Sequence, residues 1–202
     1  MLPSNSPSGK PPSSYYEVLY WKISEEPNRF VMMNFLPILL AIGFGIGFFV
    51  LIRVFNGSLS LALSNKEILI FVIGIPIVLA FHEFLHGIVM RGFGARPRYG
   101  FWMKGLMFYA KASGYAFKRN HYALIVLAPL LSLSVLFCLG TVLLASNSIV
   151  WILALWAIVN ASAANADVWI TAIVLRYPRS AYVVDERDGM RILLSESDTK
   201  AE

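Results

Sequence analysis

The sequence predicts an α-helical polytopic membrane protein with about four transmembrane helices, a small re-entrant or cytoplasmic β-hairpin insert and a C-terminal β-hairpin. Composition carries much of this prediction: 57% of the 202 residues are hydrophobic, and only 14% are charged. A water-soluble domain of this size cannot bury so much apolar side chain. The second observation is the arrangement of the apolar residues, which form long runs separated by polar or basic segments.

The N-terminal segment, residues 1–33, precedes the first apolar run. Met1 to Ser14 is rich in Pro, Ser, Gly and Asn, a composition typical of disorder. The remainder mixes aromatic and charged side chains, which favours an interfacial segment with its rings at the level of the lipid headgroups. No cleavable signal peptide is expected, because the first apolar run begins late and is too long for the apolar core of one.

The transmembrane domain is expected at residues 34–176. Its four spans are predicted at about residues 34–54, 67–90, 122–145 and 149–176. In the first span, Gly43 and Gly47 form a G-x-x-x-G pattern. This pattern indicates either a close helix–helix contact or the ordinary enrichment of glycine in membrane helices.

Residues 92–120, between the second and third spans, are predicted to be a β-like insert. Arg98 to Ala110 is aromatic-rich with spaced glycines, which is typical of short strands rather than of a fifth span. Such backbone is tolerated at membrane depth where it lines a protein cavity, so a re-entrant hairpin is preferred and a cytoplasmic surface sheet is the alternative. In the tail, residues 177–202, two apolar runs flank Asp188-Gly189 and predict a second hairpin.

The charge distribution predicts the topology. Seven basic residues and no acidic residue lie from Arg91 to His121, so the positive-inside rule places this segment in the cytoplasm. Both termini are then cytoplasmic, in a multi-pass protein of the bacterial inner membrane that is surrounded by the lipid bilayer. No nucleic-acid partner is expected, because the basic residues lie beside apolar spans. The single cysteine, Cys138, lies in an apolar run, which excludes an internal disulfide and a cysteine-based zinc site.

The second predicted span contains His82-Glu83-Phe84-Leu85-His86, an H-E-x-x-H pattern. Residues four apart share one face of a helix, so both histidines can bind the same metal ion. Glu83 is placed to act as a general base toward an attacking water rather than as a ligand. Ionisable residues in the middle of a membrane helix cost roughly 2.5–3.5 kcal/mol each on insertion scales. A metal site is therefore favoured over a polar packing cluster or a chance match.

A catalytic zinc ion usually has three protein ligands, so a third is needed. His121 lies at the expected membrane edge, where an interfacial or structural role is favoured. Asp167 is the only acidic residue inside another span, and no basic residue away from the ends of the other spans could pair with it. It lies nine residues before Arg176, as His82 lies nine residues before Arg91. Both then sit roughly 13 Å below the same membrane surface, which predicts Asp167 as the third ligand.

Two asparagines lie on the same predicted span as Asp167. Asn160 precedes Asp167 by seven residues and shares its helix face, whereas Asn165 lies on a different side. Either amide could donate a hydrogen bond to a substrate carbonyl or an oxyanion. Hydrogen bonding between helices is the alternative for both.

H-E-x-x-H in one membrane helix, followed by Asn160-x₆-Asp167 in a later one, resembles the site-2 protease class of intramembrane metalloproteases. More closely, the chain resembles a mostly uncharacterised bacterial family of zincin-type membrane peptidases, known as a domain of unknown function. That resemblance covers about Phe71 to Leu194. The chain departs from the site-2 pattern after Asn160, where the prolines and the glycine of that pattern are absent.

The resemblance implies a zinc ion (Zn²⁺) bound by His82, His86 and Asp167, with Glu83 as the base and Asn160 helping to hold the substrate backbone. The function predicted on these grounds is that of a zinc-dependent intramembrane endopeptidase. Its substrates would be membrane-anchored proteins, cut at or near the cytoplasmic leaflet.

The alternative is a non-catalytic metal-binding membrane scaffold or adaptor, which would keep the ligands but would not need Glu83. A metal transporter is disfavoured, because the sequence has one polar cluster and no polar path along the other helices. The sequence leaves open whether the protein is a homo-oligomer.

Overall fold

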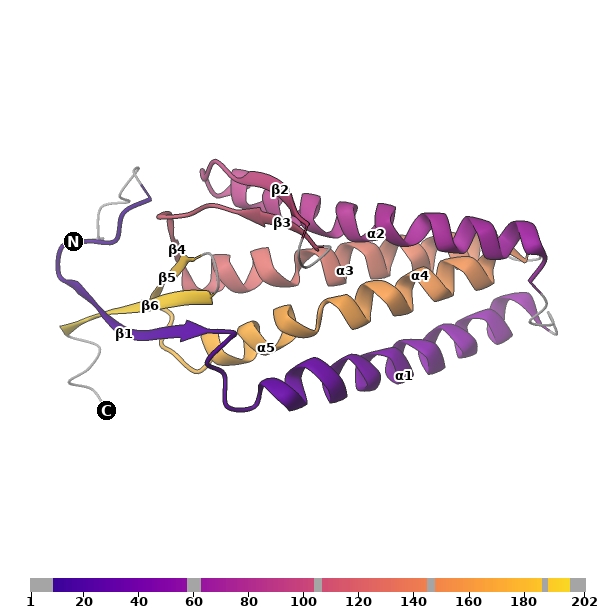
Figure 1. Ribbon diagram of the computed structural model, residues 1–202, viewed down its shortest axis with the longest axis horizontal. Helices are drawn as coiled ribbons and strands as arrows, with labels where there is room; N and C mark the ends of the chain where they lie inside the picture. The colour runs from indigo at the N-terminus through magenta and orange to yellow at the C-terminus, as the bar shows by residue number, and fades with distance from the viewer. Residues whose placement is uncertain (1–8, 58–62, 104–106, 145–147, 187–188, 197–202) are drawn as a thin grey trace. The chain divides into compact units, whose positions relative to one another are not determined.

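A computed structural model of the chain describes residues 9–57, 63–103, 107–144, 148–186 and 189–196. Helices and strands follow one another in the order β1-α1-α2-β2-β3-β4-α3-α4-α5-β5-β6 (Figure 1). The helices are α1 (Arg29–Asn56), α2 (Asn65–Gly92), α3 (Arg119–Leu143), α4 (Ile149–Ala163) and α5 (Asn165–Val174). The strands are β1 (Tyr15–Lys22), β2 (Arg98–Trp102), β3 (Met107–Lys111), β4 (Ala116–Lys118), β5 (Tyr182–Asp185) and β6 (Gly189–Ser195).

Three of the described helices, α1, α2 and α3, are long and apolar enough to cross a membrane. They arise from the three long apolar runs, each of which exceeds the roughly 20 residues that a bilayer core requires. The predicted fourth span, residues 149–176, is not one straight helix. It is divided into α4 and α5, which are bent by 46° and pass the same test of length and composition only as a pair.

The break between α4 and α5 has a local cause. The backbone N–H of Ala164 still donates to the Asn160 carbonyl (3.0 Å), as in a continuing helix. The Asn165 side chain then donates from Nδ2 to the Ser162 carbonyl (2.9 Å), which gives that carbonyl a partner outside the helical ladder. Asparagine side chains that bond to backbone groups favour helix ends. The break therefore needs neither proline nor glycine.

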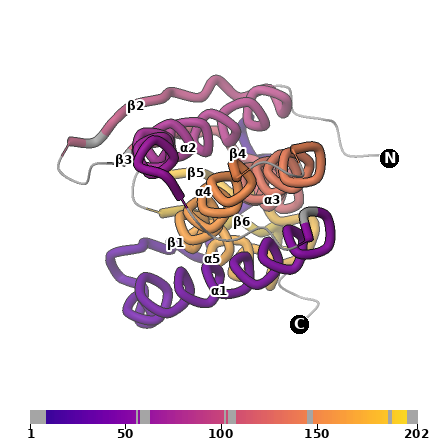
Figure 2. The backbone as a smooth tube through the Cα atoms, turned by 90° about the vertical axis from the view of Figure 1, so that its right-hand side faces the viewer, coloured from indigo at the N-terminus to yellow at the C-terminus, as the bar shows by residue number. Residues whose placement is uncertain are grey.

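The chain divides into two compact units, one helical and one mixed. The helical unit, residues 30–83 and 128–166, is built around α4 (Figure 2). The Trp156 indole donates to the Phe71 carbonyl of α2 (3.1 Å), and the Ser162 hydroxyl donates to the Pro37 carbonyl of α1 (3.3 Å). On the side of α3, the rings of Phe137 and Trp156 lie 6.4 Å apart. Small residues on α4 are fully buried and permit this close packing.

The G-x-x-x-G pattern of α1 makes no close helix contact within the described part of the chain. A Cβ atom placed on Gly43 or Gly47 would have no neighbour within 4 Å there. The glycine between them, Gly45, faces Ile158 of α4, whose Cδ1 lies 3.7 Å from such an atom. Of the two interpretations of the pattern, ordinary glycine enrichment therefore fits the packing within this chain.

The mixed unit contains a four-stranded antiparallel sheet in the order β1-β6-β5-β4. The predicted C-terminal hairpin is confirmed as β5 and β6, in which Tyr182 pairs with Leu193 and Asp185 with Met190. Asp188, in the predicted turn, lies outside the described residues. The pairing of β1 with β6 is not predicted by the sequence, because the aromatic residues of β1 suit a membrane interface and a strand equally well.

The predicted β-like insert contains the hairpin of β2 and β3, in which Arg98 pairs with Lys111. Whether it is re-entrant stays a prediction, and its residues 104–106 lie outside the described part. The hairpin lies against α2 at Gly87, where a side chain would overlap the Tyr99 ring. Tyr99 also packs near Phe84, with ring centroids 6.0 Å apart. The hairpin therefore lies against α2 at the C-terminal end of the H-E-x-x-H segment.

Candidate metal centre

The two histidines of the H-E-x-x-H pattern lie one turn apart on one face of α2. Both are buried: His82 is 4% exposed and His86 is 7% exposed. A buried imidazole needs a hydrogen-bond partner at each polar nitrogen, since an unpaired polar group inside a protein is costly. The partners of the two rings therefore decide which nitrogen of each is left for a metal ion.

His82 is oriented by a side chain. Its Nδ1 lies 2.8 Å from Oδ1 of Asn160, in the last turn of α4, and both groups are buried. An amide oxygen can only accept, so Nδ1 of His82 carries the proton and donates it. Neutral His82 then has its lone pair on Nε2, the form in which imidazole binds a metal.

His86 is oriented by the backbone. Its Nδ1 lies 2.9 Å from the carbonyl oxygen of Ile125, in α3, and this contact is also buried. The carbonyl can only accept, so Nδ1 donates here as well and Nε2 carries the lone pair. Fixing one ring nitrogen so that the other faces the metal is the usual arrangement around histidine ligands.

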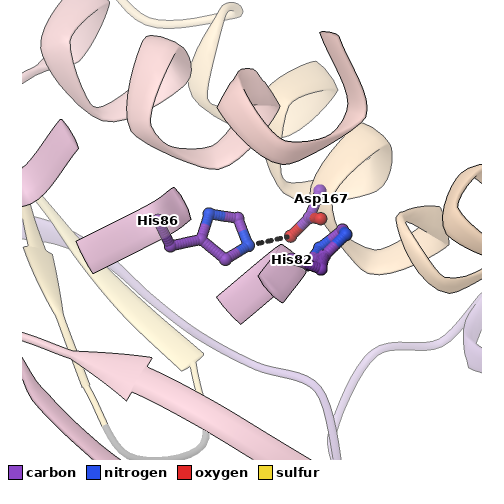
Figure 3. A group of neighbouring side chains, drawn as sticks. All are labelled: His82, His86 and Asp167. Carbon is purple, nitrogen blue, oxygen red and sulfur yellow. Dashed lines mark ion pairs between the residues drawn. The ribbon is translucent and has the colours of Figure 1, made fainter. Parts of the chain in front are cut away.

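Asp167 completes the cluster from the first turn of α5 (Figure 3). Its Oδ1 lies 3.6 Å from Nε2 of His86. One ligand atom each from His82, His86 and Asp167 lies within 4.8 Å of the other two. The structure thus brings together the three residues that the sequence predicts as ligands. A carboxylate near a helix N-terminus is also favoured by the helix dipole.

The chemistry of this donor set fits a cation. With both Nδ1 atoms donating, neutral histidines direct two Nε2 lone pairs toward a carboxylate, so three acceptors converge. Three acceptors repel one another unless a cation or extra protons lie among them. Two imidazoles and one carboxylate are the ligand types of catalytic zinc sites, which leave a fourth position open.

Glu83 and His121 lie outside this group of three. Glu83 is half-buried and follows His82 directly on α2. Its Cα is turned by about 100° from that of His82 around the helix axis, so it borders the ligand face without being part of it. His121 stacks on Phe93, with ring centroids 4.1 Å apart. This stacking agrees with the structural role expected for His121.

The two asparagines with predicted substrate roles have different positions. Asn160 is fully buried and holds His82; its Nδ2 has no hydrogen-bond partner among the described residues. Asn165 lies at the break between α4 and α5, where it donates to Ser162. Contact with substrate stays a prediction for both. The structure gives Asn160 a second role, that of orienting a predicted ligand, which its sequence position alone does not indicate.

Two further groups near the centre are not predicted from the sequence. One is the Ile125 carbonyl, since a backbone acceptor on an apolar residue has no side-chain signature. The other is Asp185 of β5, which accepts hydrogen bonds from the Ala112 N–H and the Tyr122 hydroxyl, both at 3.3 Å. Burial raises the pKa of Asp185 to about 6, and the two hydrogen bonds oppose that rise. Asp185 thereby links the end of β3 to the first turn of α3, the helix that supplies the Ile125 carbonyl.

Comparison with known proteins gives one family. A family model with the description “Putative zincin peptidase” matches residues 75–182, which is more than half of the chain. The matched region contains the H-E-x-x-H residues, Asn160 and Asp167. No curated protein and no solved structure matches the chain.

The cluster predicts the metal content of the purified protein. About one zinc ion per chain is expected, bound by three side chains. His82→Ala, His86→Ala and Asp167→Ala should each lower zinc affinity by more than about 100-fold, since loss of an orienting neighbour alone costs about 10–100-fold. Elemental analysis and competition with a chromophoric chelator measure both quantities. His121→Ala is the matched control and should keep the metal; full zinc in Asp167→Ala together with loss in His121→Ala would refute the ligand set.

Substitutions of Asn160 should separate its two roles. Asn160→Ala removes the acceptor for His82 and should weaken zinc binding by about 10–100-fold. Asn160→Asp keeps an acceptor oxygen but lacks the Nδ2 donor, so it should retain zinc. If Asn160 also holds substrate, Asn160→Asp should lose peptidase activity while keeping its metal. Unchanged zinc affinity in Asn160→Ala would contradict the orienting role.

Proposed function

The chain belongs to the “Putative zincin peptidase” family, and from this premise we propose that it is a zinc-dependent endopeptidase of the bacterial inner membrane. Its substrates would be membrane-anchored proteins, cut at or near the cytoplasmic leaflet. The observation that carries the proposal is the convergence of His82, His86 and Asp167, with both Nδ1 atoms held by acceptors and Glu83 beside them.

The proposed reaction is hydrolysis of a peptide bond. Zinc bound by the three residues would supply a Lewis acid that activates water and polarises a carbonyl. Glu83 would accept the proton of the attacking water and then donate it to the leaving amine. A carboxylate suits both steps because it can take up and release a proton without changing position. Asn160 and the Ile125 carbonyl would keep the two imidazoles in the metal-binding tautomer throughout.

The helices that carry the site support a membrane location. The H-E-x-x-H residues lie on α2, a 28-residue helix that is long and apolar enough to cross a bilayer, and three or four such segments could do so. Asp167 and His82 are each nine residues from a basic residue at the end of their segment. In the proposed topology the site would lie roughly 13 Å from the cytoplasmic surface, within reach of a membrane-anchored chain.

A substrate helix must unwind before its peptide bonds can react, because helical carbonyls are already hydrogen-bonded and shielded. The hairpin of β2 and β3 is a two-stranded sheet in the described part of the chain, so each strand pairs on one side only. We propose that an outer edge of this hairpin pairs with the unwound segment and satisfies its backbone groups where water is scarce.

Glu83→Gln should abolish cleavage of a membrane-anchored substrate while leaving zinc and fold intact. Glutamine keeps the size of the side chain but cannot accept a proton from water at neutral pH. Loss of a general base typically lowers the rate by about 10²–10⁴-fold. The assay is cleavage of candidate single-span proteins in liposomes, with a zinc chelator as a second control. Cleavage by Glu83→Gln at the wild-type rate would instead support the alternative of a non-catalytic metal-binding scaffold or adaptor.

The membrane topology can be tested with reporter fusions. A reporter fused after Gly57 should be periplasmic, and one fused after Lys118 should be cytoplasmic, because the basic segment from Arg91 to Arg119 is retained inside. Alkaline phosphatase and green fluorescent protein fusions measure the two sides. A periplasmic reporter after Lys118 would overturn the four-span topology and the depth argument for Asp167.

A further inference from the structure

Pro129 lies inside α3 and is buried. In an α-helix the N–H of each residue donates to the carbonyl four residues earlier. The residue in register with the Ile125 carbonyl is therefore Pro129, and proline has no N–H. The helix itself leaves the Ile125 carbonyl without its usual donor.

That same carbonyl accepts the hydrogen bond from His86. The distance from His86 Nδ1 to the Ile125 oxygen is 2.9 Å, and Ile125 is completely buried. No solvent reaches Ile125 to supply a substitute donor, and buried carbonyls in proteins almost always have one. The Ile125 oxygen, which Pro129 leaves without a helical donor, thus accepts from a predicted metal ligand instead.

We propose that Pro129 is a positioning residue of the metal centre. Because it has no N–H, the Ile125 carbonyl has no helical donor and accepts a hydrogen bond from His86 instead. The inference rests on the proposed zinc site and adds to it the reason why His86 presents Nε2. With any other residue at position 129, a backbone N–H would compete for the Ile125 oxygen. Proline also displaces the carbonyl four residues earlier, because its ring cannot approach as closely as an N–H does.

Competition for this oxygen would change the state of the ring. If the Ile125 oxygen returns to the helical ladder, Nδ1–H of His86 shares its acceptor or loses it. The tautomer with its proton on Nε2 then becomes more populated, and this tautomer can donate to the Asp167 carboxylate, 3.6 Å away. A proton on Nε2 blocks metal binding there, so zinc affinity must fall.

Pro37 provides a matched control. It lies inside α1, which carries none of the three predicted ligands. Pro37→Ala restores one backbone N–H within a long apolar helix, as Pro129→Ala does, and it keeps the carbonyl that accepts from Ser162. The two variants therefore differ in which carbonyl regains its donor.

The experiment compares the full-length wild type, Pro129→Ala and Pro37→Ala in detergent. Zinc affinity is measured by chelator competition, and the histidine tautomers of the zinc-free proteins by ¹⁵N NMR at about pH 8, well above the ordinary histidine pKa. The chain has three histidines, so the spectrum can be assigned with His121→Ala. The melting temperature of each zinc-free protein is the third measurement.

Pro129→Ala should bind zinc about 10–100-fold more weakly and shift His86 from Nδ1–H toward Nε2–H. Its melting temperature should be unchanged or higher, because alanine restores a helical hydrogen bond. Pro129→Val, closer to proline in volume, should give the same shift if alanine leaves a cavity. Pro37→Ala should keep the wild-type zinc affinity and tautomers.

Three outcomes would be decisive against parts of this scheme. If the wild type binds zinc and both Pro129 variants match its affinity and tautomer, the positioning role is wrong while the proposed function stands. If zinc loss in both variants accompanies a lower melting temperature with unchanged tautomers, Pro129 acts only on the fold and the inference is overturned. If the wild type itself binds no zinc, the proposed zinc site is wrong, and the inference that rests on it is wrong as well.

Discussion

An imidazole that offers Nε2 to a metal ion must keep a proton on Nδ1, and in an apolar helical interior that proton needs an acceptor. Acceptors are scarce there because nearly every backbone carbonyl is already paired within its own helix. The chain meets this constraint in two ways. The side-chain amide oxygen of Asn160 accepts a hydrogen bond from His82. The backbone carbonyl of Ile125, which has no helical donor, accepts one from His86. By packing against α2, α4 and α3 thus each supply the acceptor that orients one histidine.

The break between α4 and α5 serves the same site. On one continuous helix, residues seven apart would share a face about two turns from each other, roughly 10 Å along the axis. With the chain bent at Ala164, Asn160 ends one helix against His82 and Asp167 begins the next against His86. The two residues can therefore contact two ligands on successive turns of α2. The Asn165 side chain, which occupies the Ser162 carbonyl, makes the bend without a helix-breaking residue.

The strands of the mixed unit support the centre from outside the helices. Tyr99 of β2 lies over Gly87, which follows His86 directly, so the absence of a side chain at one position allows the hairpin to approach the ligand helix. Asp185 of β5 holds Tyr122 at the start of α3, one turn before the carbonyl that orients His86. The pairing of β1 with β6 extends this sheet with a strand that precedes the matched family region.

Much of the candidate site follows from sequence because its signals are local. The spacing of His82 and His86 places them on one helix face whatever surrounds them, and an acidic residue inside an apolar run needs a cationic partner wherever it lies. The long apolar runs and the C-terminal hairpin follow from composition and short-range pattern in the same way. The depth count that selects Asp167 also needs only helix geometry and the positions of basic residues.

Only the tertiary structure decided the rest, because it depends on groups whose partners are remote in the chain. The aromatic pattern of Tyr15–Lys22 does not show that this segment is a strand paired with β6, and only the structure does. The sequence shows that Pro129 lacks an N–H, but not that the freed carbonyl faces His86, which depends on how α3 packs on α2. Likewise, the sequence does not show whether the Asn160 amide contacts a substrate or orients a metal-binding histidine. The sequence determined which residues can bind a metal; the tertiary structure determined which atom of each histidine is available to do so.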